Sequence, residues 1–142
     1  MRIQKKYAAL LIATLFLLGA AGLLFAQDAF LPGITSSDDH PNGCIDCHKS
    51  TDGGDYRLNV ELEDMGGHPD VTNIVKTLPD DCMFCHKEGA KAGELNVITH
   101  QGHYHNPGDN HFVSGYQGAC LHCHALDTRT WEMSIKSGSK NW

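Results

Sequence analysis

The sequence predicts a fold that is mostly coil with a few short α-helices and little or no β-sheet, wrapped around a core that apolar side chains alone do not build. The 142 residues include 6 cysteines and 10 histidines, and one cysteine motif occurs three times. After residue 26, only 33 of 116 residues are apolar residues other than cysteine. This share is low for a globular domain. Because short chains bury little surface, we expect covalent or metal staples to supply the missing stability.

Residues 1–26 are expected to be a signal peptide. Arg2, Lys5 and Lys6 form a basic start, residues 8–26 carry no charge, and the run ends on Ala26 before polar chain. This order of segments is typical of a cleaved export signal. The alternative is an uncleaved membrane anchor, because the apolar run is almost long enough to span a bilayer. In both cases the protein is exported, to the periplasm or alternatively to the cell surface or the extracellular space.

Acidic residues dominate the chain beyond this segment. Eight basic residues face 17 acidic ones there, a formal net charge of −9. No basic stripe is present, so the composition argues against a nucleic-acid partner. An acidic surface favours a basic docking partner, and solubility alone is the alternative explanation. Membrane contact is expected only if residues 1–26 stay uncleaved.

The exported part divides into an N-terminal loop segment, residues 27–43, and a domain at residues 44–142. The loop segment is rich in Gly, Ser, Pro and Asp. The domain is organised by Cys-x-x-Cys-His motifs at 44–48, 82–86 and 120–124, each starting 38 residues after the one before. Equal spacing hints at an internal repeat.

Two helices are expected between and after these motifs. From Asp70 to Leu78, apolar residues recur at helical spacing, with Pro69 at the first turn and Pro79 at the end. The second helix is expected from Cys120 to Ile135 and is ended by Gly138. No segment alternates convincingly between apolar and polar residues as a half-buried strand does.

Three chemistries can use paired cysteines of this spacing: attachment of c-type haem, a zinc site and disulfide bonding. Haem attachment uses every part of the motif, because the two thiols form thioethers with the haem and the following histidine becomes an iron ligand. Zinc does not need that histidine, and disulfides need neither the histidine nor the spacing. All six cysteines lie in pairs followed by histidine, and an odd number of pairs suits four-thiolate zinc sites poorly.

The counts therefore predict three haem c groups as cofactors, each containing iron. Six cysteines are expected to bind haem, and the histidine of each motif is expected to bind its iron as the proximal ligand. The cysteines are Cys44, Cys47, Cys82, Cys85, Cys120 and Cys123, and the histidines are His48, His86 and His124.

On these motifs the chain resembles the multihaem c-type cytochromes, in particular the small class III group with bis-histidine haems. The resemblance covers most of residues 40–142. It implies that packed haems form the core, that coil and short helices wrap them, and that each iron has a second histidine ligand. The chain has about 39 exported residues for each haem, more than the most compact members of the group.

Seven histidines remain for the three distal positions, where imidazole is a strong iron ligand. His100 and His103 are spaced like the distal pair of the family, in which two nearby histidines serve different haems. His68 is the third choice, because a glycine pair precedes it. His40, His105 and His111 are the alternatives, and the sequence does not decide among them. The remaining histidine, His122, is expected at the surface.

The expected function is electron transfer, because six-coordinate iron has no open position for a substrate, so no enzymatic activity is predicted. The partners would be redox proteins, such as other multihaem cytochromes or a membrane quinol-oxidising complex. One alternative is a subunit that self-associates into an extracellular haem filament, with His40 or another spare histidine binding across the subunit boundary. A second alternative is a small multihaem reductase with one open haem site.

Overall fold

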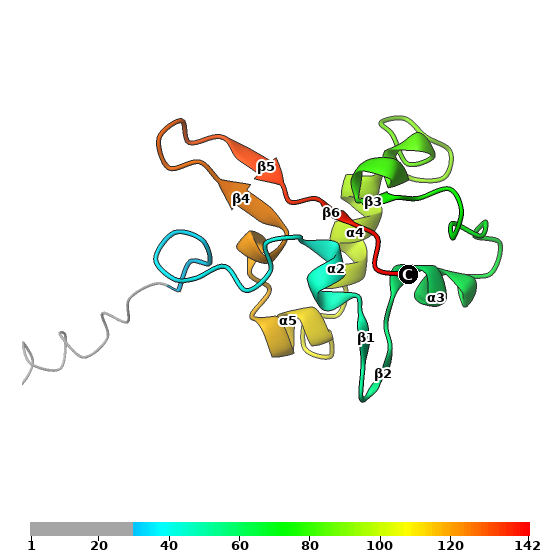
Figure 1. The fold of residues 1–142 in the computed structure, drawn as a ribbon, viewed down its shortest axis with the longest axis horizontal. Coiled ribbons are helices and arrows are strands. Elements are labelled where there is room, and N and C mark those ends of the chain that lie inside the picture. The colour runs from blue at the N-terminus through cyan, green and yellow to red at the C-terminus, as the bar shows by residue number, and fades with distance from the viewer. Residues whose placement is uncertain (1–29) are drawn as a thin grey trace, which may run out of the picture. The chain divides into compact units, whose positions relative to one another are not determined.

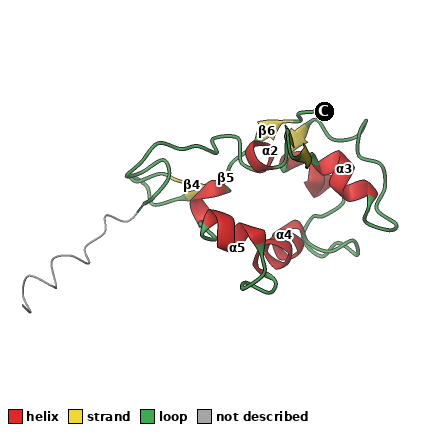
Figure 2. Cartoon of the chain, turned by 90° about the horizontal axis from the view of Figure 1, so that it is seen from below, coloured by secondary structure: helices red, strands yellow, loops and turns green. Residues whose placement is uncertain are grey.

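Short helices and strand pairs joined by long loops make up the computed structural model, which describes residues 30–142 (Figures 1 and 2). Residues 31–142 form one compact unit. The signal peptide expected at residues 1–26 lies outside the described residues. Across residues 30–142, no helix is both long and apolar enough to cross a membrane.

The described chain is mostly coil with a few short helices, which confirms the coarse prediction of the fold. Four α-helices are present in it: α2 (Cys44–Cys47), α3 (Leu58–Glu63), α4 (Leu95–Tyr104) and α5 (His111–Tyr116). Single 3₁₀ turns, η1 (Asp80–Phe84) and η2 (Cys120–His122), lie at the second and third cysteine motifs. The longest helix, α4, has only ten residues.

Strands are very short and pair two by two. The six strands within residues 30–142 are β1 (Ser50–Thr51), β2 (Gly54–Asp55), β3 (Thr77–Leu78), β4 (His124–Leu126), β5 (Met133–Ile135) and β6 (Gly138–Ser139). The pairs β1–β2 and β4–β5 are local antiparallel hairpins, whereas β3–β6 joins the middle of the chain to its C-terminal end.

The helix predicted from Asp70 to Leu78 is wrong. Only one turn forms, in which the Ile74 and Val75 amides donate to the Val71 carbonyl. The chain then extends into β3, which pairs with β6. Five of the nine residues in this segment are β-branched, and such residues favour extended backbone. The helical spacing of its apolar residues instead reflects burial of Val75 and Leu78.

The helix predicted from Cys120 to Ile135 is also wrong. After the turn η2, the chain forms the β4–β5 hairpin, in which Leu126 faces Met133. Asp127 makes the hairpin turn, because its carboxylate accepts hydrogen bonds from the Arg129 and Thr130 amides. Aspartate side chains commonly offer the backbone this alternative to a helix.

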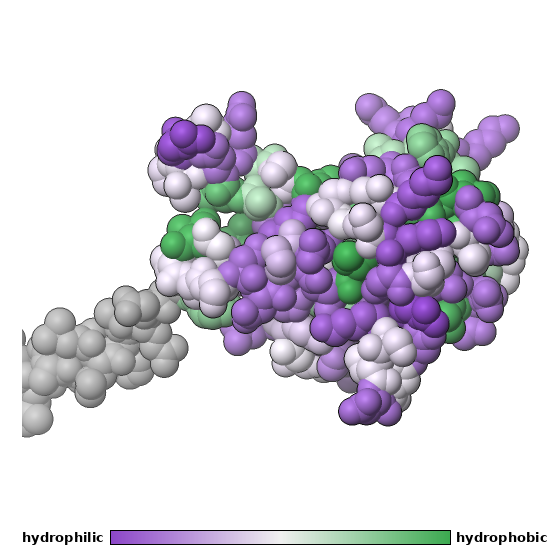
Figure 3. Space-filling view, in the orientation of Figure 1, coloured by the Kyte–Doolittle hydropathy of each residue, from purple (hydrophilic) through white to green (hydrophobic). Residues whose placement is uncertain are grey.

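The polypeptide buries very little apolar side chain of its own. Among the described residues, only Val75, Leu78 and Leu121 are buried hydrophobic side chains. Phe84 remains 69% exposed and Trp131 75% exposed. Apolar side chains therefore reach the surface among polar ones, as Figure 3 shows for one face. A domain of this length normally encloses a larger apolar core.

The C-terminal segment, residues 136–142, connects regions that are far apart in the sequence. It runs from β5 through β6 to the C-terminus (Figure 1). Asn141 donates to the carbonyls of Ile45 and His48, in the first cysteine motif. The Lys136 amide donates to the Cys123 carbonyl, in the third motif. We call this segment the C-terminal strap.

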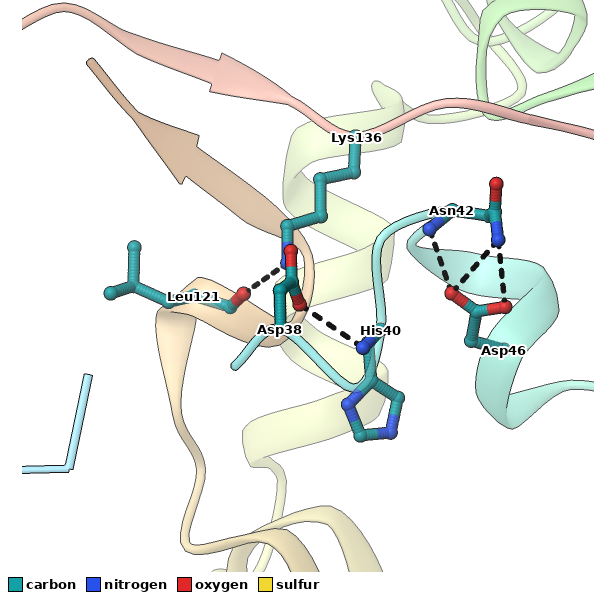
Figure 4. A network of polar contacts seen from close by, with 6 residues as sticks. All are labelled: Asp38, His40, Asn42, Asp46, Leu121 and Lys136. Carbon is teal, nitrogen blue, oxygen red and sulfur yellow. Dashed lines mark hydrogen bonds and ion pairs between the residues drawn. The ribbon is translucent and has the colours of Figure 1, made fainter. Parts of the chain in front are cut away.

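A buried ion pair anchors the start of the C-terminal strap (Figure 4). The Lys136 ammonium lies 2.8 Å from the Asp38 carboxylate and donates to the Leu121 carbonyl at 2.6 Å. Only 5% of the Lys136 side chain is exposed, and 24% of that of Asp38. The pair thus holds the N-terminal loop, the third motif and the strap together.

Candidate functional site

Each cysteine motif lies on a single turn of helical backbone. The His48 amide donates to the Cys44 carbonyl at 2.8 Å, and the His86 amide donates to the Cys82 carbonyl at 3.0 Å. At the third motif the 3₁₀ turn η2 closes through the Cys123 amide. None of the six cysteines forms a disulfide. One turn of backbone therefore presents two thiols and a histidine at each of three places.

The motifs lie near one another. Burial, together with the nearby thiols of Cys123 and Cys82, raises the pKa of the Cys44 thiol to about 12. Burial and Cys123 also raise the pKa of Cys47. These thiols are accordingly protonated at neutral pH, and members of all three motifs are close enough to influence one another.

Each motif histidine meets one histidine from outside the motifs. The ring centroids lie 6.1 Å apart in all three pairs, which are His48–His103, His68–His86 and His100–His124. The structure thus brings together the six histidines that the sequence nominates as iron ligands. It also supplies what the sequence could not, namely which distal candidate faces which motif.

The ring separation suits one metal atom between the two imidazoles. A metal–imidazole bond is about 2 Å long, and a ring nitrogen lies about 1 Å from its own ring centre. Two such halves add up to about 6 Å. Within residues 30–142, no three His, Cys, Asp or Glu side chains group as a metal site, so the histidines meet in pairs only.

Backbone carbonyls hold these imidazoles. A carbonyl accepts but does not donate, so an Nδ1 bonded to it carries the proton and leaves the Nε2 lone pair free for a metal. Five of the six rings have such a contact, at 2.5 to 3.2 Å: His48 with Tyr56, His68 with Pro69, His86 with Gly93, His100 with Asn96, and His103 with Thr99. Metal-binding histidines are typically oriented in this way.

Helix α4 carries two of the three distal candidates. His100 and His103 are three residues apart and so lie on neighbouring positions of one helical face. The start of α4 is tied to the second motif, because the Leu95 amide donates to the His86 carbonyl. The sequence analysis missed this helix, although the spacing of the two histidines is itself a helical signal. His100 also lines an open cavity of about 500 Å³ with Gln101, Tyr104 and His105.

The first motif histidine is held neutral. Burial lowers the pKa of His48, the Tyr56 carbonyl partly opposes this effect, and His103 lowers the pKa further. An imidazole must be unprotonated at the ligating nitrogen to bind a metal. The surroundings of His48 therefore favour the state that can act as a ligand.

The four remaining histidines are not paired with a motif histidine. His122, expected at the surface, is buried, which corrects that prediction. Its ring lies 4.4 Å from that of His40, inclined at 67°. This separation is too short for a metal atom between opposed imidazoles. His105 and His111 are exposed, and the His111 ring contacts Tyr116 rather than a motif histidine.

Gly93, whose carbonyl accepts a hydrogen bond from the second motif histidine, is closely packed against Ile98. Its φ is +88°, its carbonyl accepts from His86 Nδ1 at 2.9 Å, and an added Cβ would lie 2.8 Å from Ile98 Cγ2. We expect Gly93→Ala to lower the free energy of unfolding by about 2 kcal/mol or more, because backbone strain and the Ile98 contact add together.

Gly89→Ala is the matched control, and urea denaturation of both variants and of the wild type measures the two losses. Gly89 has a φ of +71°, but nothing lies within 4 Å of its added Cβ. This variant should lose only about 1 kcal/mol of unfolding free energy, the part that comes from backbone strain. Equal losses in the two variants would contradict the close packing of Gly93 against Ile98.

Comparisons with models of known protein families, with curated proteins and with solved structures find no match to this chain.

Proposed function

We propose that this chain is an electron-transfer protein that carries three covalently attached c-type haems, each bound by two histidines. One observation supports the proposal above all others. Each Cys-x-x-Cys-His motif lies opposite one further histidine, at the same ring separation of 6.1 Å in all three cases. Three separate sites with the same ring separation are hard to explain by packing alone.

The polypeptide fits three such groups in other respects. Few apolar side chains are buried and many large ones are exposed, so flat apolar groups packed between the motifs would cover surface that the chain itself leaves in water. The Nδ1 contacts with backbone carbonyls prepare the rings as ligands before any metal binds.

When bound, bis-histidine haem takes up and releases single electrons. The chain's own residues then have three tasks. The cysteines would attach the groups, the paired histidines would bind the iron, and the loops bring the three motifs close together. Because two histidines would bind each iron and leave no position for a substrate, we propose an electron carrier rather than an enzyme.

We further propose that the protein works outside the cytoplasm, in the periplasm or at the cell surface. Its partners would be redox proteins, such as other multihaem cytochromes or a membrane quinol-oxidising complex. The net charge of −9 after residue 26 favours a basic docking face on the partner.

The test is a spectroscopic redox titration of protein purified from a host that attaches c-type haem. We expect entirely low-spin haem and low reduction potentials, because two histidine ligands favour the ferric state more than histidine and methionine do. High-spin haem in the oxidised wild type, or strongly positive potentials throughout, would overturn the proposal.

One distal variant sharpens this test. His68→Ala should turn one of the three haems high-spin and leave the other two low-spin, because His68 faces only His86 among the motif histidines. The matched control is His111→Ala, whose ring contacts Tyr116 and no motif histidine. It should leave all three haems low-spin.

A further inference from the structure

The three histidine pairs have equal separations but unequal ring orientations. The rings of His68 and His86 are inclined by only 8°, and those of His100 and His124 by 10°. The rings of His48 and His103 are crossed at 87°. One pair is therefore nearly perpendicular and two pairs are nearly parallel.

Contacts on both sides of the crossed pair hold this orientation. His48 Nδ1 lies 3.2 Å from the Tyr56 carbonyl, and His103 Nδ1 lies 2.8 Å from the Thr99 carbonyl. The Phe112 ring packs edge-on against the His103 ring, with centroids 5.0 Å apart and planes at 79°. Of the distal candidates, only His103 has a phenylalanine against its ring among the described residues.

Asn110 holds Phe112 in this position. Its side-chain oxygen caps α5 by accepting from the Phe112 amide at 3.0 Å. Its side-chain NH₂ donates to the carbonyls of Gly102 and His105, at 3.0 and 3.1 Å. Asn110 thereby ties the first turn of α5 to the end of α4, the helix that carries His103.

We propose that Phe112 is a positioning residue that holds the His103 imidazole across that of His48, so that the haem attached at Cys44 and Cys47 differs electronically from the other two. This inference rests on the proposed function. Parallel imidazoles donate π-electrons to the same iron d orbital and separate it in energy from its partner. Crossed imidazoles donate to different orbitals and leave the two nearly equal. Axial ligands are one of the means by which a protein tunes haem iron.

Electron paramagnetic resonance of the oxidised holoprotein distinguishes these two states. Nearly equal orbitals give a strongly anisotropic low-spin signal with a large maximal g value, and separated orbitals give an ordinary rhombic signal. We expect one large-g signal and two rhombic signals of equal weight. Three rhombic signals would overturn the inference while leaving the proposed function intact. High-spin signals, or a protein without covalent haem, would overturn the proposed function itself.

Two distal variants assign the signals. His103→Ala should abolish the large-g signal, produce one high-spin haem and leave both rhombic signals. His100→Ala should abolish one rhombic signal and leave the large-g signal. If His103→Ala instead removed a rhombic signal, the assignment of the crossed pair would be wrong.

Two further variants test the positioning role. Phe112→Leu keeps an apolar side chain but removes the flat ring, and Asn110→Ala releases the turn that carries it. Both should move the large-g signal toward the rhombic type while all three haems stay low-spin and the two rhombic signals stay unchanged. Ser114→Ala, on the same helix, is the control and should change nothing. An unaltered large-g signal in Phe112→Leu would show that Phe112 does not position His103.

Discussion

Replacement of Lys136 by methionine is expected to lower the free energy of unfolding of the protein by about 3 kcal/mol. The Lys136 ammonium is bonded to the Asp38 carboxylate and to the Leu121 carbonyl, and it is almost entirely buried. Methionine keeps the length of the side chain but leaves both oxygens without this donor. Removal of one partner from a buried ion pair typically costs about 3–5 kcal/mol, and partial exposure of Asp38 places this case at the lower end. Urea denaturation followed by circular dichroism measures the loss.

The pH dependence of this loss provides an internal check. Burial raises the pKa of the Asp38 carboxyl, but the hydrogen bonds from the Lys136 ammonium and the His40 amide outweigh burial and hold the pKa below its usual value. A carboxyl with a lowered pKa stabilises the fold above its unfolded pKa, and this stabilisation is lost as the pH falls through the folded value. The difference in unfolding free energy between wild type and Lys136→Met should therefore become smaller below about pH 4.

The matched control is Lys140→Met. Lys140 also donates to a backbone carbonyl, that of Thr72 at 2.6 Å, and no carboxylate is paired with it in the described chain. The control should lose about 1 kcal/mol of unfolding free energy, the usual contribution of one hydrogen bond. This loss should stay the same at acidic pH. Equal losses in both variants at neutral pH would contradict the importance of the Asp38 ion pair.

Deletion of residues 138–142 is expected to cost about 5 kcal/mol. It removes β6, the partner of β3, together with the Lys140 contacts and both hydrogen bonds from Asn141 to the first motif. Five hydrogen bonds disappear besides those that join β3 and β6, and each contributes about 1 kcal/mol. Leu78, the most deeply buried side chain of the described residues, also loses its cover. Urea denaturation midpoints of the full and shortened chains measure this effect.

Asn141→Ala measures how much of this loss comes from the hydrogen bonds between the C-terminal strap and the first cysteine motif. The variant removes only the donors to the Ile45 and His48 carbonyls, at 3.3 and 2.8 Å, so it should cost about 1–2 kcal/mol. A shortened chain that unfolds at the same urea concentration as the full one would show that the C-terminal strap does not join the motifs.

The coarse fold was predictable because it depends on composition. Too few apolar residues for an ordinary core, with many glycines, indicate coil and short helices, and the structure confirms this. The segments from Asp70 to Leu78 and from Cys120 to Ile135 were wrongly predicted as helices, because local spacing does not report pairing with distant strands. The β3 partner lies about 60 residues away along the chain, and no local signal marks it.

Only the site residues that lie within one short sequence motif could be predicted. A motif of five residues names its own cysteines and histidine, but the pairing of His48 with His103 depends on how α4 folds back on the first motif. The ion pair of Asp38 with Lys136 joins residues 98 positions apart, and neither has a sequence feature that marks it. Such contacts become visible only in three dimensions.

The intact mass of the purified protein under denaturing conditions shows whether three haems are bound covalently to the six cysteines. Thioether-bound haem stays attached during denaturation, whereas zinc is released and a disulfide adds no mass. We expect the mass of the exported polypeptide plus three haem groups. The mass of the bare polypeptide, with or without disulfides, would contradict it.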